Sequence, residues 1–234
     1  MISISDLKCT ARGNLLGHFR PPIYSTIVSF LVSLIIYSLF FTGIETTPIG
    51  MATNIVAVVV IYFFIALMYI GRLNMHLGFA RNQEITTRDM WFGFRGKTFA
   101  YLGASLIVFA ISFVCMLPFM VCYVLYTGDG NSMPLLVASI VFAILGAIAY
   151  IIIMLRFMFA FMVLVDIKIS TVKQAFIISS NITKGRRKKL FATCLSFIGL
   201  YVLSILSFGL GFLWTLPYLD QTLVAFYLEA SKKQ

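Results

Sequence analysis

The sequence has 234 residues, of which 61% are hydrophobic and only 11% are charged. A soluble domain is about 45–50% apolar and about 25% charged, so these proportions exclude an ordinary water-soluble protein. The 18 Lys and Arg residues outnumber the 8 Asp and Glu residues and give a net charge of +10. With so few charged residues, where this charge lies along the chain carries more information than its size.

Taken in chain order, five uncharged stretches are long enough to cross a bilayer core, which needs roughly 20 apolar residues. They are residues 21–44, 46–71, 98–128, 130–155 and 190–219. The last stretch continues past Asp220 to Leu228, and one helix of that length would measure about 58 Å, nearly twice the membrane thickness. Because Gly209 and Gly211 provide backbone freedom, we predict a turn at residues 207–211 and therefore six transmembrane helices.

The basic residues fix the expected orientation. In a six-span arrangement, seventeen of the 18 Lys and Arg residues fall on one side of the membrane, and the opposite loops carry only Glu45 and Asp129. The positive-inside rule then predicts that both termini lie in the cytoplasm. A five-span arrangement would leave Lys232 and Lys233 on the opposite side of the membrane from the other basic residues.

A diverged repeat suggests three units, at residues 1–83, 84–168 and 169–234. Each unit begins with an Ile-Ser or Ile-Thr step, reaches a basic residue followed by Gly, and then enters a span. The three pairs of signals are Ile4-Ser5 with Arg12-Gly13, Ile85-Thr86 with Arg95-Gly96, and Ile169-Ser170 with Lys184-Gly185. Ser and Thr are preferred helix N-caps and Gly is a common helix stop, so each unit is expected to open with a short interfacial amphipathic helix before its two-span hairpin. Any cytoplasmic loop collects caps and basic residues, so coincidence is the competing interpretation.

Ionisable residues inside a span usually face a partner or water, because burying them in lipid is costly. Arg72, Arg156 and Asp220 are expected at equivalent levels of three helices and form a candidate intramembrane polar cluster, with Arg156 as the counter-charge of Asp220. Asn74, His76 and Gln221 are further candidates, and we favour hydrogen bonding over proton transfer for His76. The cluster is either a transport path or a structural ion pair that fixes helix register.

The most charged segment runs from residue 184 to residue 189. It serves as a topology signal, and a cluster of this size also attracts anionic lipid at about 1 kcal/mol per cation. The candidate headgroup contacts are Lys184, Arg186, Arg187, Lys188 and Lys189. The sequence lacks a P-loop, a nucleophile elbow and metal-ligand spacing, so we expect no enzyme activity, no cofactor and no metal site. Nucleic acid is not an expected partner, because the cationic segment is held at the membrane.

Several motifs resemble a family of bacterial multipass membrane proteins known as domain of unknown function 975. They are Phe79-Ala80-Arg81, Trp91-Phe92-Gly93-Phe94, Arg156-Phe157, Lys184-Gly185, Leu195-Ser196-Phe197-Ile198-Gly199, Gly209-x-Gly211, Leu213-Trp214 and Pro217-Tyr218-Leu219. The family's Asp-x-Pro turn is Asp166-Ile167-Lys168 here, and its usual Trp after Ile-Gly is Leu200. The resemblance implies a Gram-positive plasma membrane, and it implies no activity.

We therefore expect an all-α integral protein of the bacterial cell membrane with an accessory role. The bilayer, anionic lipids, a membrane protein partner or a second copy of the chain are its expected partners, and envelope stress or antimicrobial-peptide tolerance is the expected setting. The alternative function is a small transporter or channel with a polar centre at Arg156 and Asp220.

Overall fold

The protein is helical throughout the residues that its structure, a computed structural model, describes: 3–40, 48–128, 132–166 and 171–232. Several sequence features lie outside these residues, namely Glu45, Asp129, Lys168, Ile169, Ser170 and Lys233. In chain order the elements are α1 (Ile4–Leu15), α2 (Arg20–Phe40), α3 (Pro48–Ala80), the 3-10 helix η1 (Thr87–Phe94), α4 (Thr98–Gly128), α5 (Met133–Phe157), α6 (Ala160–Asp166), α7 (Val172–Thr183), α8 (Arg187–Leu195), α9 (Ile198–Leu206) and α10 (Phe212–Ser231).

Five helical stretches are long and apolar enough to cross a membrane, and they mark the chain as a membrane protein. They are Arg20–Leu39, Ala52–Ala80, Thr98–Gly128, Met133–Asp166 and Arg187–Leu206. The first four coincide with the first four predicted spans, and the fifth contains α8 and α9. The expected sixth span, α10, is not among them, because polar residues such as Asp220 and Gln221 interrupt its apolar character.

The predicted turn before α10 is confirmed. Helix α9 ends at Leu206 and α10 begins at Phe212, with Phe208 and Gly209 between them in the left-handed region at φ 52° and φ 88°. The two helices then approach closely, and the hydroxyls of Ser204 and Thr215 hydrogen-bond at 2.9 Å. A side chain at Gly211 would press on the backbone of Ser204, so glycine is required at this contact.

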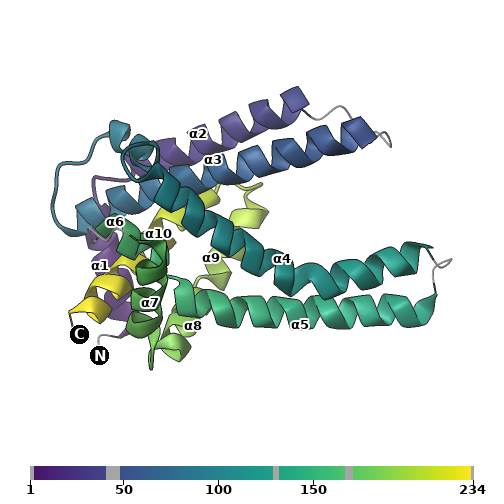
Figure 1. Ribbon diagram of the computed structural model, residues 1–234. Coiled ribbons are helices and arrows are strands. Elements are labelled where there is room, and N and C mark those ends of the chain that lie inside the picture. Colours follow the sequence, from purple (N-terminus) through teal and green to yellow (C-terminus); the bar gives the residue numbers. More distant parts are fainter. Residues whose placement is uncertain (1–2, 41–47, 129–131, 167–170, 233–234) are drawn as a thin grey trace.

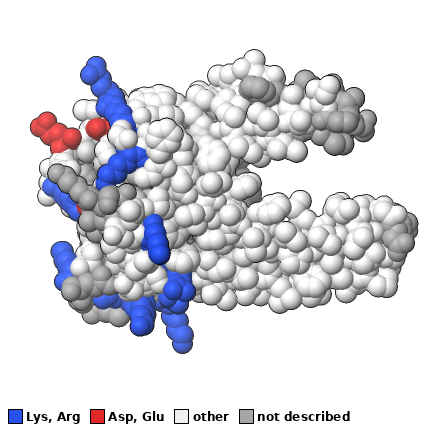
Figure 2. Space-filling model, viewed as in Figure 1, with Lys and Arg blue, Asp and Glu red and all other residues white. Residues whose placement is uncertain are grey.

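Two long hairpins, α2 with α3 and α4 with α5, project in the same direction from a common base (Figure 1). The base contains α1, α6, α7 and the C-terminal half of α10, so the first and last described helices lie at the same end of the molecule. Lys and Arg side chains gather at this basal end, whereas the projecting hairpins are apolar and diverge from one another (Figure 2).

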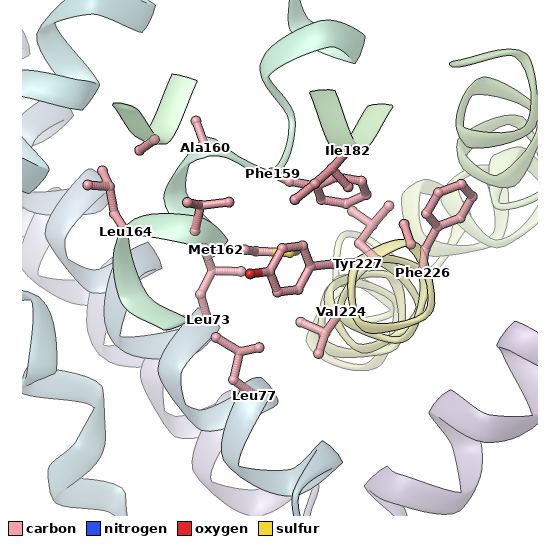
Figure 3. Close-up of a cluster of buried hydrophobic side chains, with 14 of the residues drawn as sticks. Leu73, Leu77, Phe159, Ala160, Met162, Leu164, Ile182, Val224, Phe226 and Tyr227 are labelled. Atoms are coloured by element: carbon pink, nitrogen blue, oxygen red, sulfur yellow. The ribbon is translucent and has the colours of Figure 1, made fainter. Parts of the chain in front are cut away.

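The main hydrophobic core lies at this base, around α10. Leu73 and Leu77 of α3, Phe159 beside α6 and Ile182 of α7 converge on Tyr227 of α10 (Figure 3). Most of α10 from Thr215 to Ala230 is buried, whereas the outer parts of α4 and α5 expose most of their large apolar side chains. The fold therefore concentrates its specific packing at one end and leaves the other end for lipid.

The three short elements that open the predicted units differ in form. Helix α1 opens with a capping box in which Ser3 and Asp6 bond each other's backbone, and these hydrogen bonds lower the pKa of Asp6 below its usual value. The second element, η1, is a 3-10 helix rather than the expected α-helix. The third element, α7, is an α-helix that buries Phe176, Ser179 and Ile182 in the base.

The backbone of η1 packs directly on α3. A Cβ atom at Gly93 would overlap the carbonyl of Leu67, and one at Gly71 would overlap the carbonyl of Met90. The close contact at Gly93 explains why the Trp91-Phe92-Gly93-Phe94 motif carries a glycine, since any side chain there would push η1 and α3 apart.

Replacing Gly93 with Ala therefore tests this contact. We expect Gly93→Ala to lower the free energy of unfolding by about 1–3 kcal/mol, the usual cost of overpacking, measured by denaturant titration in detergent micelles. Gly199→Ala in α9 is the matched control, because nothing lies within 4 Å of a Cβ at that position. Equal unfolding curves for the two variants would contradict the close contact between η1 and α3.

Candidate functional site

Asp220 lies in the middle of α10, buried against α3. Its Oδ2 is 3.9 Å from Nε of Arg72 and 4.0 Å from Nε2 of His76, two residues one helical turn apart on α3. The Asp220 side chain is 9% exposed and that of Arg72 is 15% exposed, so the pair is largely shielded from solvent. A carboxylate enclosed by a mostly apolar helix packing needs such a cation, because an unpaired buried charge is strongly unfavourable.

The neighbouring residues extend this pair into a polar cluster across three helices. Oε1 of Gln221 accepts a hydrogen bond from Nδ1 of His76 at 2.7 Å, and both side chains are fully buried. Arg72 donates from Nη1 to the hydroxyl of Thr26 on α2 at 3.1 Å, and its guanidinium lies 5.5 Å from the ring centroid of Tyr69. The cluster therefore links α2, α3 and α10 at one level of the fold.

The cluster still has unused hydrogen-bonding capacity. Nε of Arg72, Nε2 of His76, Oδ2 of Asp220 and Nε2 of Gln221 are buried and have no hydrogen-bond partner within the part of the chain that is described. At 3.9 Å, the contact between Arg72 and Asp220 is too long for a direct hydrogen bond, although it is close enough for strong electrostatic attraction. His76 adds to this attraction only when its ring is protonated.

Arg156 does not belong to this cluster, which corrects its expected pairing with Asp220. At the C-terminal end of α5, Arg156 is exposed and donates from Nε to the hydroxyl of Ser180 on α7 at 2.8 Å. The Arg156 carbonyl accepts a hydrogen bond from the hydroxyl of Thr183 at 3.0 Å. The structure thus brings Arg72 and Asp220 together and places Arg156 where α5 meets α7.

A second ion pair was not anticipated from the sequence. Asp166, at the end of α6, forms a salt bridge with Arg81, just after α3, and accepts a hydrogen bond at 2.9 Å from the hydroxyl of Tyr227. Arg81 lies in the Phe79-Ala80-Arg81 motif and Asp166 begins the segment that replaces the family's Asp-x-Pro turn, so the sequence marks both residues. No spacing within the chain reveals that they meet.

Some basic residues expected at lipid headgroups serve the fold instead. Nη1 of Arg186 donates to the carbonyl of Ala230 at 2.7 Å and to that of Ile182 at 3.4 Å, and so ties α7 to the end of α10. Lys184 and Lys188 are exposed, whereas Arg187 and Lys189 are partly buried. The headgroup role of the segment stays a prediction for these residues, and Arg186 has a structural role in addition.

Helix α1 also uses its cations for packing. Lys8 donates to the carbonyl of Ser196 at 2.9 Å and lies over the ring of Phe197, and Arg12 donates to the hydroxyl of Tyr218 at 2.9 Å. Partial burial, and then the nearby charge of Arg12, lower the pKa of Lys8. These contacts dock α1 on the C-terminal part of the chain, so both cations have a structural role.

A double-mutant cycle separates the two arginines. We expect Arg72→Gln and Asp220→Asn to show a coupling energy of about 0.5–3 kcal/mol, because each residue compensates the other's buried charge. Arg156→Gln combined with Asp220→Asn should show no coupling, since Arg156 bonds Ser180. Free energies of unfolding in micelles measure both cycles, and coupling to Arg156 in place of Arg72 would refute the observed pairing.

Within the described residues no group of three or more His, Cys, Asp or Glu side chains lies close enough to hold a metal ion. No curated protein and no solved structure matches the chain. One family model does match, described as a protein of unknown function (DUF975), and it covers residues 1–234. The resemblance drawn from the sequence motifs is confirmed, and the chain belongs to this family.

Proposed function

We propose that the protein is a non-catalytic accessory protein of the bacterial cytoplasmic membrane, and that its basal face acts on anionic lipid or on a membrane partner. The observation that carries the proposal is the separation of charge along the molecule. The described Lys and Arg side chains gather around the base, next to helices long enough to span a bilayer (Figure 2). On this proposal the basal cations lie at the depth of lipid phosphates, where each contributes about 1 kcal/mol of attraction.

The proposal includes a six-span topology with both termini in the cytoplasm. Its support is the turn at residues 207–211, which returns the chain to the end from which α8 began, and the common position of α1 and the end of α10 (Figure 1). The three units would then each consist of a short basal element, namely α1, η1 or α7, followed by a hairpin. No catalytic step is proposed, because the sequence offers no recognisable nucleophile or phosphate-binding motif.

The lipid preference can be tested with the wild-type protein in nanodiscs. We expect a higher melting temperature in discs containing phosphatidylglycerol than in discs of phosphatidylcholine alone, because binding to the folded state stabilises it. Raising the salt concentration to 0.5 M should reduce the difference, since salt screens exposed charges. The same melting temperature in both lipids would count against the proposal.

A second candidate function is transport, and the buried cluster at Arg72, His76, Asp220 and Gln221 favours it. Four buried polar atoms without partners are unusual in a membrane protein interior and are a common feature of ion or proton sites. The polar centre of this alternative therefore moves from Arg156 to the contact between α3 and α10.

Proton flux into proteoliposomes distinguishes the transport hypothesis. If the cluster conducts protons, an enclosed pH-sensitive dye should respond to an imposed pH gradient with wild-type protein, and Asp220→Asn should abolish the response. Arg156→Gln should retain it and serves as the matched control. Wild-type vesicles no leakier than protein-free vesicles would exclude proton conduction through the cluster.

A further inference from the structure

Two open grooves flank the end of α5 at the base of the molecule. The first, the α5–α8 groove, has a volume of about 350 Å³ and is lined by Ile148, Ile151, Ile152, Phe191, Arg187 and Lys188, among others. Its isoleucines come from the last turns of α5, and both of its cations come from the first turn of α8. The groove is therefore apolar along its length and cationic where α8 starts.

Arg187 in this groove has an unmet hydrogen-bonding requirement. Its Nε is buried and has no hydrogen-bond partner among the described residues, in contrast to the guanidinium of Arg186 beside it. The first turn of α8 adds backbone N–H groups that have no acceptor within the helix, and the positive end of the helix dipole. An anionic oxygen at this position would satisfy both the side chain and the helix terminus.

The second groove, the α4–α7 groove, repeats this composition on another side of α5. It has a volume of about 380 Å³, and its lining includes Ile107, Ile111, Phe176, Ile177, Arg156 and Lys173. Ser180 holds Nε of Arg156 at 2.8 Å and so orients the guanidinium at the groove. Two separate grooves thus combine an apolar wall with a pair of cations.

We propose that each groove binds one anionic phospholipid, with the phosphate on the cation pair and an acyl chain along the apolar wall. The inference rests on the proposed lipid function and gives it specific residues. The chemistry selects a lipid because the ligand must join a negative head to an apolar chain. Both grooves also run along α5, which belongs to a stretch of membrane-spanning length. A free phosphate would leave the exposed isoleucines uncovered, and an acidic peptide would bring unpaired backbone groups into the bilayer.

The test counts bound lipids by native mass spectrometry of the detergent-solubilised full chain titrated with phosphatidylglycerol. We expect two tightly retained lipids on the wild type and one on each double variant, Arg187→Gln/Lys188→Gln and Arg156→Gln/Lys173→Gln. Removing two cations should weaken the affected site by about thirtyfold, at about tenfold per 1.4 kcal/mol. Phosphatidylcholine should be retained less well at both sites.

The matched control is Arg88→Gln/Arg95→Gln, which removes the same charge from two exposed positions outside both grooves. It should retain two lipids. Arg187→Lys keeps the charge and should also retain both lipids. A melting curve for each variant separates loss of binding from loss of folding.

Other outcomes overturn the inference in distinguishable ways. If phosphatidylglycerol stabilises the wild type while the groove variants and the control lose lipid equally, the general lipid function stands and the two sites do not. Displacement of the lipid by glycerol phosphate would indicate an anion site without a chain. If the groove variants lose a dimer that the wild type forms, and no bound lipid is lost, the grooves bind a second copy of the chain.

Discussion

The burial of Asp220 is the constraint on which the arrangement of the last helix depends. A carboxylate in the middle of α10 cannot face lipid at a tolerable free energy, so α10 must turn this side toward a cation. Arg72 and His76 of α3 lie opposite it, at 3.9 and 4.0 Å, and Arg72 also reaches Thr26 of α2. This electrostatic requirement fixes the rotation of α10 against the first hairpin. The same rotation directs Tyr227, two turns further along nearly the same face of α10, toward Asp166 and the core.

The distribution of packing follows from the two solvents that surround the molecule. At the base, water favours burial of apolar area, and the side chains of α3, α6, α7 and α10 form a dense core (Figure 3). Along the projecting hairpins, lipid tails solvate Leu, Ile and Phe as well as another helix does, so exposed apolar side chains carry no penalty. The hairpins can therefore diverge, whereas the base must close around its polar contacts.

The sequence predicts the elements well, because apolar length, charge and glycine act locally. Four spans and the turn at residues 207–211 appear where expected, and Asp220 has the buried charged partner that its position requires. The identity of that partner was beyond the sequence, since Arg72 and Arg156 both lie thirteen residues before the Ile-Ser or Ile-Thr step of the next unit. Spacing along a chain gives the depth of a residue in the membrane, whereas which helices become neighbours depends on packing of the whole set. The salt bridge between Arg81 and Asp166 could not be predicted from the sequence for the same reason.

The net charge of +10 also has two different physical origins in the folded chain. Lys8, Arg12, Arg72, Arg81 and Arg186 each hold helices together through bonds to carbonyls, hydroxyls or carboxylates. Arg187, Lys188, Arg156 and Lys173 border apolar grooves, and Arg156 also joins α5 to α7 through Ser180. Each structural cation commits at least one donor to the protein and has its position fixed by packing, so it is less free to follow a phosphate. A count of positive charge therefore overstates the lipid-binding capacity of this surface, and the residues that border the grooves are the appropriate measure of it.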